Sequence, residues 1–177
     1  MELIVETVIE AGIDKVFGIP GGITPFLFEE FHKNEKIEAI LARHEGSAAA
    51  MADMYGRVTG KPGVLIGQGI WTATNGGFGI AEAYYAGVPM VVITEFSDWF
   101  GMNHHAAYQS GTGEYGTIDI RNIFKAMSKY TTVANTPEEL WYGVKLAIKH
   151  ATTGRPGPAV VISKWNTMSS SIENVEA

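Results

Sequence analysis

Residues 42–57 read ARHEGSAAAMADMYGR, a run of small residues that begins near an acid and directly follows the apolar segment 37–41. The apolar segment predicts a buried strand. The alanines predict a helix whose small side chains let its backbone lie close to a sheet or to another subunit. Glu45 stands at the corner between the two elements. Spacing alone favours a glutamate that helps to start the helix, and the alternative is an acid at the carboxyl end of a parallel strand, where α/β sheets bind ligands.

The rest of the chain alternates between short apolar segments and longer segments with one apolar face, which predict strands and helices respectively. Strands are expected at 15–19, 37–41, 63–67, 89–94, 130–133 and 159–162. Helices are expected at 2–12, after the cap Thr24-Pro25, at 45–58, at 75–86, at 119–127 and from the capping box 136–139 to Gly154. We therefore expect an α/β fold with three layers, in which a mainly parallel, Rossmann-like sheet carries helices on both faces.

Two segments interrupt this alternation. Residues 95–117 are rich in glycine, histidine, asparagine and serine, and loops of this length inside a compact domain are usually functional or mobile. Residues 165–177 are polar and include three consecutive serines, which is typical of a tail or of a linker to another domain. We expect one domain over residues 1–164, followed by that tail.

Composition excludes several classes of protein. The formal net charge is −6 and the chain has no basic run, which argues against a nucleic-acid partner. It has no cysteine, and therefore neither a disulfide framework nor a thiolate metal site. No apolar stretch reaches membrane-spanning length, and the N-terminus lacks the features of a signal peptide. These observations predict a soluble, cytoplasmic protein without a membrane partner and without a metal site of its own.

Six short motifs occur in an order that resembles the pyrimidine-binding domain of thiamine diphosphate enzymes, in particular acetolactate synthase large subunits. They are VFGIPGG at 16–22, RHEGSAA at 43–49, ADMYGRVTGKPGV at 52–64, ATNG at 73–76, AGVPM at 86–90 and GRPGP at 154–158. The resemblance covers most of the chain, and the set is far more specific than any one motif.

The resemblance implies roles for four residues. It makes Glu45 the acid that hydrogen-bonds to the pyrimidine ring of thiamine diphosphate and activates the cofactor. Such an acid must share a proton near neutral pH, which requires burial that opposes the helix dipole. Gly21 and Gly22 would let the backbone approach the cofactor ring or the substrate, unless they are plain turn glycines. Asn75 would lie near the cofactor, and it could also cap a helix.

The chain departs from the pattern at residues 67–75, which read GQGIWTATN where relatives usually read SGPGATN. The segment is longer than in relatives and carries the bulky Trp71. This side chain is either a core or interface aromatic residue or a wall of the substrate site.

A second departure lies in the irregular stretch. Pyruvate-decarboxylase-like relatives carry a histidine pair that handles protons on the bound intermediate, and His104 and His105 are candidates for that role because imidazole titrates near neutrality. The alternative is that both are solvated and idle. Gln109 is a candidate substrate contact. Acetolactate synthases tend to read DAFQE where this chain has GEYG at 113–116, so the product is left open.

The family binds the cofactor's diphosphate and its Mg²⁺ with a Gly-Asp-Gly and a later Asn-Asn, and these 177 residues contain no such pair. The resemblance therefore implies that another domain or subunit binds diphosphate and Mg²⁺. We expect a homodimer or heteromer that assembles through the helix around 48–52 and becomes an enzyme acting on small 2-oxo acids only when so completed.

Three functional hypotheses follow. The first is a carboligase of the acetolactate synthase type, and its variant is a 2-oxo acid decarboxylase that uses the histidine pair. The second is a non-catalytic assembly domain of the same fold. The third is a nucleotide-binding Rossmann domain, which fits only the alternation of strands and helices.

Overall fold

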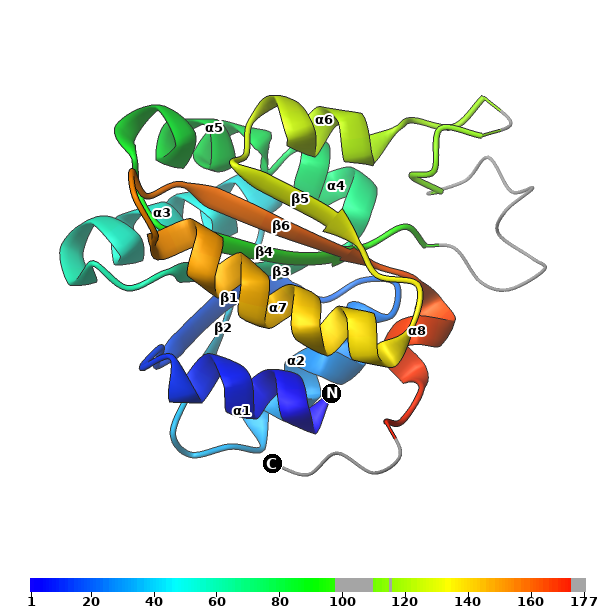
Figure 1. Ribbon diagram of the computed structural model, residues 1–177, viewed down its shortest axis with the longest axis horizontal. Coiled ribbons are helices and arrows are strands. Elements are labelled where there is room, and N and C mark those ends of the chain that lie inside the picture. Colours follow the sequence, from blue (N-terminus) through cyan, green and yellow to red (C-terminus); the bar gives the residue numbers. More distant parts are fainter. Residues whose placement is uncertain (98–109, 115, 173–177) are drawn as a thin grey trace.

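Six strands pair in parallel in the order β2-β1-β3-β4-β6-β5, and they form the central layer of the molecule (Figure 1). The computed structural model describes residues 1–97, 110–114 and 116–172. The strands are β1 (Lys15–Ile19), β2 (Glu38–Leu41), β3 (Gly63–Gly67), β4 (Met90–Glu95), β5 (Tyr130–Val133) and β6 (Pro158–Ser163). The expected α/β fold is confirmed, and this sheet is parallel throughout.

Helices cover both faces of the sheet, as the sequence predicts. One face carries α1 (Glu2–Glu10), α2 (Thr24–His32), α7 (Pro137–Thr152) and the short α8 (Trp165–Ser169). The other face carries α3 (Glu45–Thr59), α4 (Gly69–Thr74), α5 (Gly77–Ala86) and α6 (Ile120–Ala126). Strands β3, β4 and β6 are buried along their whole length between these layers, whereas the edge strands β2 and β5 are partly exposed. This burial explains why the inner strands have continuously apolar sequences.

Helix α3 lies close to its neighbours because its inward side chains are small. Ala48, Ala49 and Ala52 are fully buried. A Cβ atom added at Gly63, at the start of β3, would collide with the backbone of Ala52. A Cβ atom added at Gly79, on α5, would lie 2.6 Å from the carbonyl carbon of Ala49. The close approach predicted from the alanine-rich stretch is therefore present on two sides of the helix.

The order of the strands creates a switch point between β1 and β3. The connection that leaves β1 runs through α2 on one face, and the connection that leaves β3 runs through α4 and α5 on the opposite face. In open α/β sheets, the crevice at the carboxyl ends of two such strands is where ligands bind. The turn Pro20–Gly22 follows β1, and Gln68 follows β3, so both lie at this crevice.

The structure corrects two element boundaries near this crevice. Residues 69–74 form helix α4, where a loop was expected, and Asn75 ends that helix instead of starting the next one. Ile23, not Thr24, occupies the N-cap position of α2. The Thr24 hydroxyl instead donates to the carbonyl oxygen of Gly21 at 2.7 Å and accepts from its N–H at 3.0 Å. Thr24 therefore pins the glycine turn and does not cap the helix.

The segment that follows β6 also differs from the expected tail. Residues 165–169 form α8, in which Thr167 and Met168 are buried, and this helix packs against α7. The expectation of a polar tail is therefore wrong for residues 165–169. The apolar side chain of Met168 is buried there and anchors the helix within an otherwise polar stretch. The domain boundary at 164 stays a prediction. Among the helices in the described part of the chain, none is long and apolar enough to cross a membrane.

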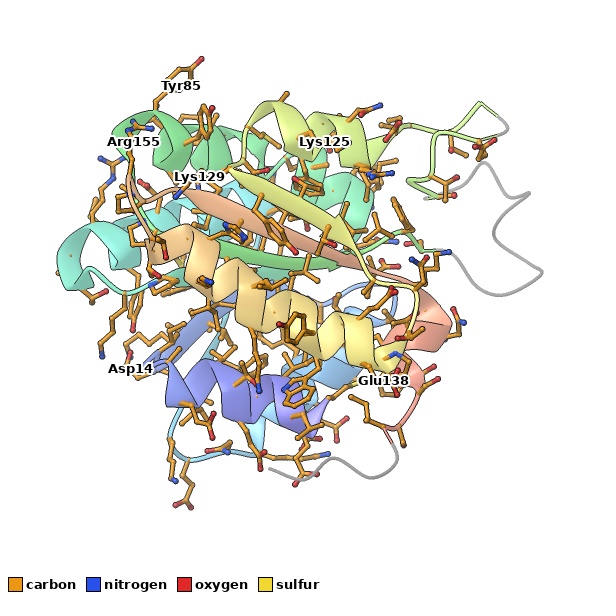
Figure 2. The ribbon with its side chains drawn as sticks, in the orientation of Figure 1. Asp14, Tyr85, Lys125, Lys129, Glu138 and Arg155 are labelled. Carbon is orange, nitrogen blue, oxygen red and sulfur yellow. The ribbon has the colours of Figure 1, made fainter. Side chains whose placement is uncertain are left out.

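Side chains cap the ends of two helices, and the sequence predicts the first of these caps. At the start of α7 the Thr136 hydroxyl accepts from the N–H of Glu139 at 3.2 Å, as the capping box predicts, while the Glu139 carboxylate accepts from the N–H of Asn135 at 2.7 Å. At the end of α5 the Arg155 guanidinium donates to the carbonyl oxygens of Tyr84 and Tyr85 at 3.0 and 2.6 Å (Figure 2). Arg155 thereby ties the loop before β6 to α5.

A buried tyrosine, Tyr55, links α3 to Asp14. Asp14 is exposed and directly precedes β1 (Figure 2). The Tyr55 hydroxyl donates to the Asp14 carboxylate at 2.7 Å, and this hydrogen bond lowers the pKa of Asp14 below its ordinary value of 3.8. Because the folded state favours the ionised form of Asp14, this carboxylate stabilises the fold above pH 3.8. The stabilisation is lost as the pH falls through the lowered pKa that Asp14 has in the folded state.

We therefore expect Tyr55→Phe to lower the free energy of unfolding by about 1 kcal/mol near neutral pH. The difference in free energy of unfolding between the variant and the wild type should shrink once the pH falls below about 4, which is the ordinary pKa of a carboxyl group. Urea unfolding at several pH values measures it. The matched control is Tyr142→Phe, because Tyr142 is exposed on α7. A difference that stays constant with pH would show that the Asp14 carboxylate is not what Tyr55 stabilises.

Candidate functional site

Glu45 and Asn75 lie together although they are 30 residues apart in the sequence. Asn75 Nδ2 donates to Glu45 Oε2 at 3.0 Å. Glu45 is the first residue of α3 and is half-buried, and Asn75 directly follows the last residue of α4. The other Glu45 oxygen, Oε1, has no hydrogen-bond partner among the described residues. The pair therefore presents a fixed carboxyl group that can make one further hydrogen bond.

The corner before α3 holds the Glu45 backbone in place. His44 is the N-cap residue in an extended conformation, and its Nδ1 accepts from the N–H of Gly46 at 3.1 Å. A Cβ atom added at Gly46 would lie 3.1 Å from the carbonyl oxygen of Asn75. The start of α3 and the end of α4 are thus packed backbone against backbone. This packing fixes the distance between Glu45 and Asn75.

The glycine turn after β1 packs against polar side chains of the neighbouring strands. A Cβ atom added at Gly21 would lie 3.3 Å from Gln68 Oε1, and one added at Gly22 would collide with the carboxylate of Glu95. Gly22 also has φ of +60°, which favours glycine. Besides its hydrogen bonds to Thr24, the turn therefore packs closely on Gln68 and Glu95. Its role toward a cofactor stays a prediction.

Three residues that sequence reasoning did not select form a buried polar cluster at the same edge. Ser97 Oγ donates to Glu95 Oε1 at 2.9 Å, and the Ser97 N–H donates to Glu95 Oε2. Gln68 Nε2 donates to Ser97 Oγ at 3.0 Å. The sequence carried one signal for this cluster, because Glu95 is a charged residue at the end of a continuously apolar strand.

The remaining candidates are distributed as follows. Trp71 lies on α4 and is 39 % exposed, so it is not a core residue of this chain. His104, His105 and Gln109 lie outside the described residues, and their roles stay predictions. Within the described residues, no three histidine, aspartate or glutamate side chains gather closely enough to hold a metal ion.

An open hollow of about 590 Å³ lies beside β5 and the end of β6. Its polar lining includes Thr112, Glu114, Asp119, Arg121, Asn135 and Lys164. Strand β5 is at the opposite edge of the sheet from β2, the strand that leads to Glu45. The hollow therefore does not form part of the site around Glu45 and Asn75.

These features define a class of protein: an α/β domain of the doubly wound kind, with a partnered glutamate near the switch point of its sheet. Residues 1–110 match the family described as thiamine pyrophosphate enzyme, N-terminal TPP binding domain. The chain belongs to this family, as its motifs indicate.

Comparison with curated proteins places acetolactate synthases among its relatives. The mitochondrial acetolactate synthase catalytic subunit of Saccharomyces cerevisiae is 35 % identical over 149 residues, which are 84 % of this chain and 20 % of the relative. The acetolactate synthase large subunit of Haemophilus influenzae is 34 % identical over 160 residues, which are 90 % of this chain and 26 % of the relative. The large subunit of acetolactate synthase isozyme 3 of Escherichia coli is 32 % identical over 160 residues, which are 90 % of this chain and 26 % of the relative. The chain therefore spans a fifth to a quarter of the length of these relatives.

Proposed function

We propose that this chain is the pyrimidine-binding domain of a thiamine diphosphate-dependent enzyme that acts on 2-oxo acids, and that Glu45 is the acid that activates the cofactor. The observation that carries the proposal is the Glu45–Asn75 pair, in which one carboxyl oxygen is held and the other is available. Family membership supports the proposal that the chain binds this cofactor, because the family is described as a thiamine pyrophosphate binding domain.

The residues fit the pyrimidine end of this cofactor. Activation requires an acid that hydrogen-bonds to one nitrogen of the pyrimidine ring. Glu45 Oε1 can form this hydrogen bond, because Asn75 occupies the other carboxyl oxygen. When bound, the cofactor supplies a nucleophilic carbon that adds to the 2-oxo group. Glu45 would hold or share a proton at the ring nitrogen, and Asn75 would keep the Glu45 carboxyl group from rotating away. The Gly21–Gly22 turn, which lies at the same edge of the sheet and packs on Gln68 and Glu95, would present its backbone to the ring.

A second domain or subunit would complete the site. The matched residues make up 20 % and 26 % of two of these relatives, so most of the length of each relative has no counterpart in this chain. Helices α3 and α5 expose apolar side chains on their outer surface, namely Met51, Met54, Val58, Phe78 and Tyr85. We propose that the domain that binds diphosphate and Mg²⁺ packs on this surface, from a second copy or from a different subunit. Because Glu45 begins α3, a partner seated there would also cover Glu45 and keep water from it.

The product distinguishes the two reactions that the proposal allows. The test uses this chain together with its diphosphate-binding domain or subunit, thiamine diphosphate, Mg²⁺ and pyruvate. Acetolactate as the main product would identify a carboligase similar to the relatives, whereas free acetaldehyde would identify a decarboxylase and favour the histidine pair. No consumption of pyruvate or of any other 2-oxo acid tested would contradict the proposal.

A non-catalytic assembly domain is the second candidate. It is favoured by one observation, the departure of residues 67–75 from the usual motif, which places a helix with the exposed Trp71 next to Asn75. An assembly domain would bind its partner with the same affinity whether or not Glu45 is intact, and the completed protein would keep its activity after loss of that carboxyl group.

A further inference from the structure

Glu95 is a fully buried carboxylate at the carboxyl end of β4, one strand from the switch point. The Ser97 hydroxyl accepts from Gln68, so its own proton points to Glu95. The Ser97 N–H donates to the second carboxylate oxygen. A directed series of donors thus runs from the end of β3 to the end of β4. Each of the two Glu95 carboxyl oxygens therefore accepts a hydrogen bond from Ser97.

The same cluster supports the two chain segments on either side of it. Among the described residues, Ser97 is the one non-glycine with positive φ, at 54°. This conformation is unfavourable for serine, and the two bonds to Glu95 hold it. On the other side, a Cβ atom at Gly22 would come within 3.0 Å of Glu95 Cδ, so the turn after β1 rests directly on the carboxylate.

We propose that Gln68, Ser97 and Glu95 form a positioning cluster that fixes the Gly21–Gly22 turn at the switch-point crevice in the geometry that ligand binding needs. Glu95 acts through the turn and does not touch the ligand, because its side chain is buried beneath it. The identity of the ligand, the pyrimidine end of thiamine diphosphate, rests on the proposed function. The mechanical coupling between Glu95 and the turn does not.

The test replaces Glu95 by glutamine, which keeps the volume but turns one acceptor into a donor. One bond from Ser97 is then lost, and the turn loses its fixed support. Amide hydrogen exchange of the chain, followed by NMR, reports this at Ser97 and at Thr24, whose N–H donates to the carbonyl oxygen of Gly21 at 3.1 Å. We expect exchange about tenfold faster at both amides and unchanged exchange at Val160 in the core of β6, because the loss of one buried hydrogen bond opens the structure locally.

In the completed enzyme, Glu95→Gln should raise the thiamine diphosphate concentration for half-maximal activity by about tenfold, with kcat changed by less than about threefold, because ordering of the turn is then required on binding. Gln68→Met removes the other donor at similar volume and should give the same pattern. Because both variants loosen one cluster, their effects should not add in the double variant. If Glu95→Gln does not fold, Gln68→Met carries the test.

Glu35→Gln, at an exposed glutamate, is the control and should match the wild type in every measurement. Exchange at Thr24 that equals the wild type would overturn the proposal, because the cluster would then not support the turn. Exchange that rises equally at Thr24 and Val160 would overturn it too, since the cluster would only stabilise the whole fold. If the wild-type enzyme consumes no 2-oxo acid but Thr24 exchange rises as expected, the proposed function fails and the positioning cluster stands.

Discussion

Replacement of Glu45 by glutamine should lower kcat of the completed enzyme by about a thousandfold, because general acid–base catalysis by one positioned group contributes factors on the order of 10² to 10⁴. The amide of glutamine can still accept the hydrogen bond from Asn75, so the start of α3 should keep its geometry. It cannot share a proton with the ring nitrogen of the cofactor. The measurement is steady-state turnover at saturating thiamine diphosphate, Mg²⁺ and 2-oxo acid.

The matched control is Glu38→Gln, on the strand that leads to the site. Glu38 is exposed and pairs with Lys15, so its loss should leave turnover unchanged. The melting temperature of both variants should stay close to that of the wild type, because neither change removes buried volume. Wild-type turnover in Glu45→Gln would refute the catalytic role and would favour a non-catalytic assembly domain of the same fold.

The position of Glu45 could be predicted because several local signals agree there. An apolar strand, a corner and an alanine-rich helix follow one another without interruption, and the strand–helix alternation then places the corner at the carboxyl edge of a parallel sheet. Consistent local signals of this kind specify a fold strongly. The small residues of α3 also predicted its close approach to the sheet.

The neighbours of Glu45 could not be predicted in the same way. Helix α4 has only six residues and begins with glycine, which is too short for an apolar period to distinguish it from a loop. Its presence moves Asn75 from the start of one helix to the end of another. The contact between Gln68 and Ser97 joins residues 29 apart, and the sequence carries no pattern for such a pair. Polar contacts between residues so far apart in the sequence could therefore not be predicted from it.

The contact between α3 and α5 connects the stability of the fold to the geometry of the site. A Cβ atom at Gly79 would lie 2.6 Å from the carbonyl carbon of Ala49, 2.7 Å from its Cβ and 2.8 Å from the nitrogen of Ala50. These atoms belong almost entirely to helix backbone and cannot rotate away. The two helices must therefore separate if any side chain is introduced at position 79.

We expect Gly79→Ala to lower the free energy of unfolding by about 2 kcal/mol and the melting temperature by about 4–8 °C, as overpacking does in a chain of this size. Gly77→Ala on the same helix is the matched control, because its nearest atoms are the flexible tip of Met127 at 3.7 and 3.8 Å. Alanine there should leave stability unchanged or raise it by up to about 1 kcal/mol through helix propensity. Equal melting temperatures for both variants would contradict the close packing. Since α3 begins at Glu45 and α5 begins two residues after Asn75, Gly79→Ala should also reduce turnover of the completed enzyme more than Gly77→Ala does.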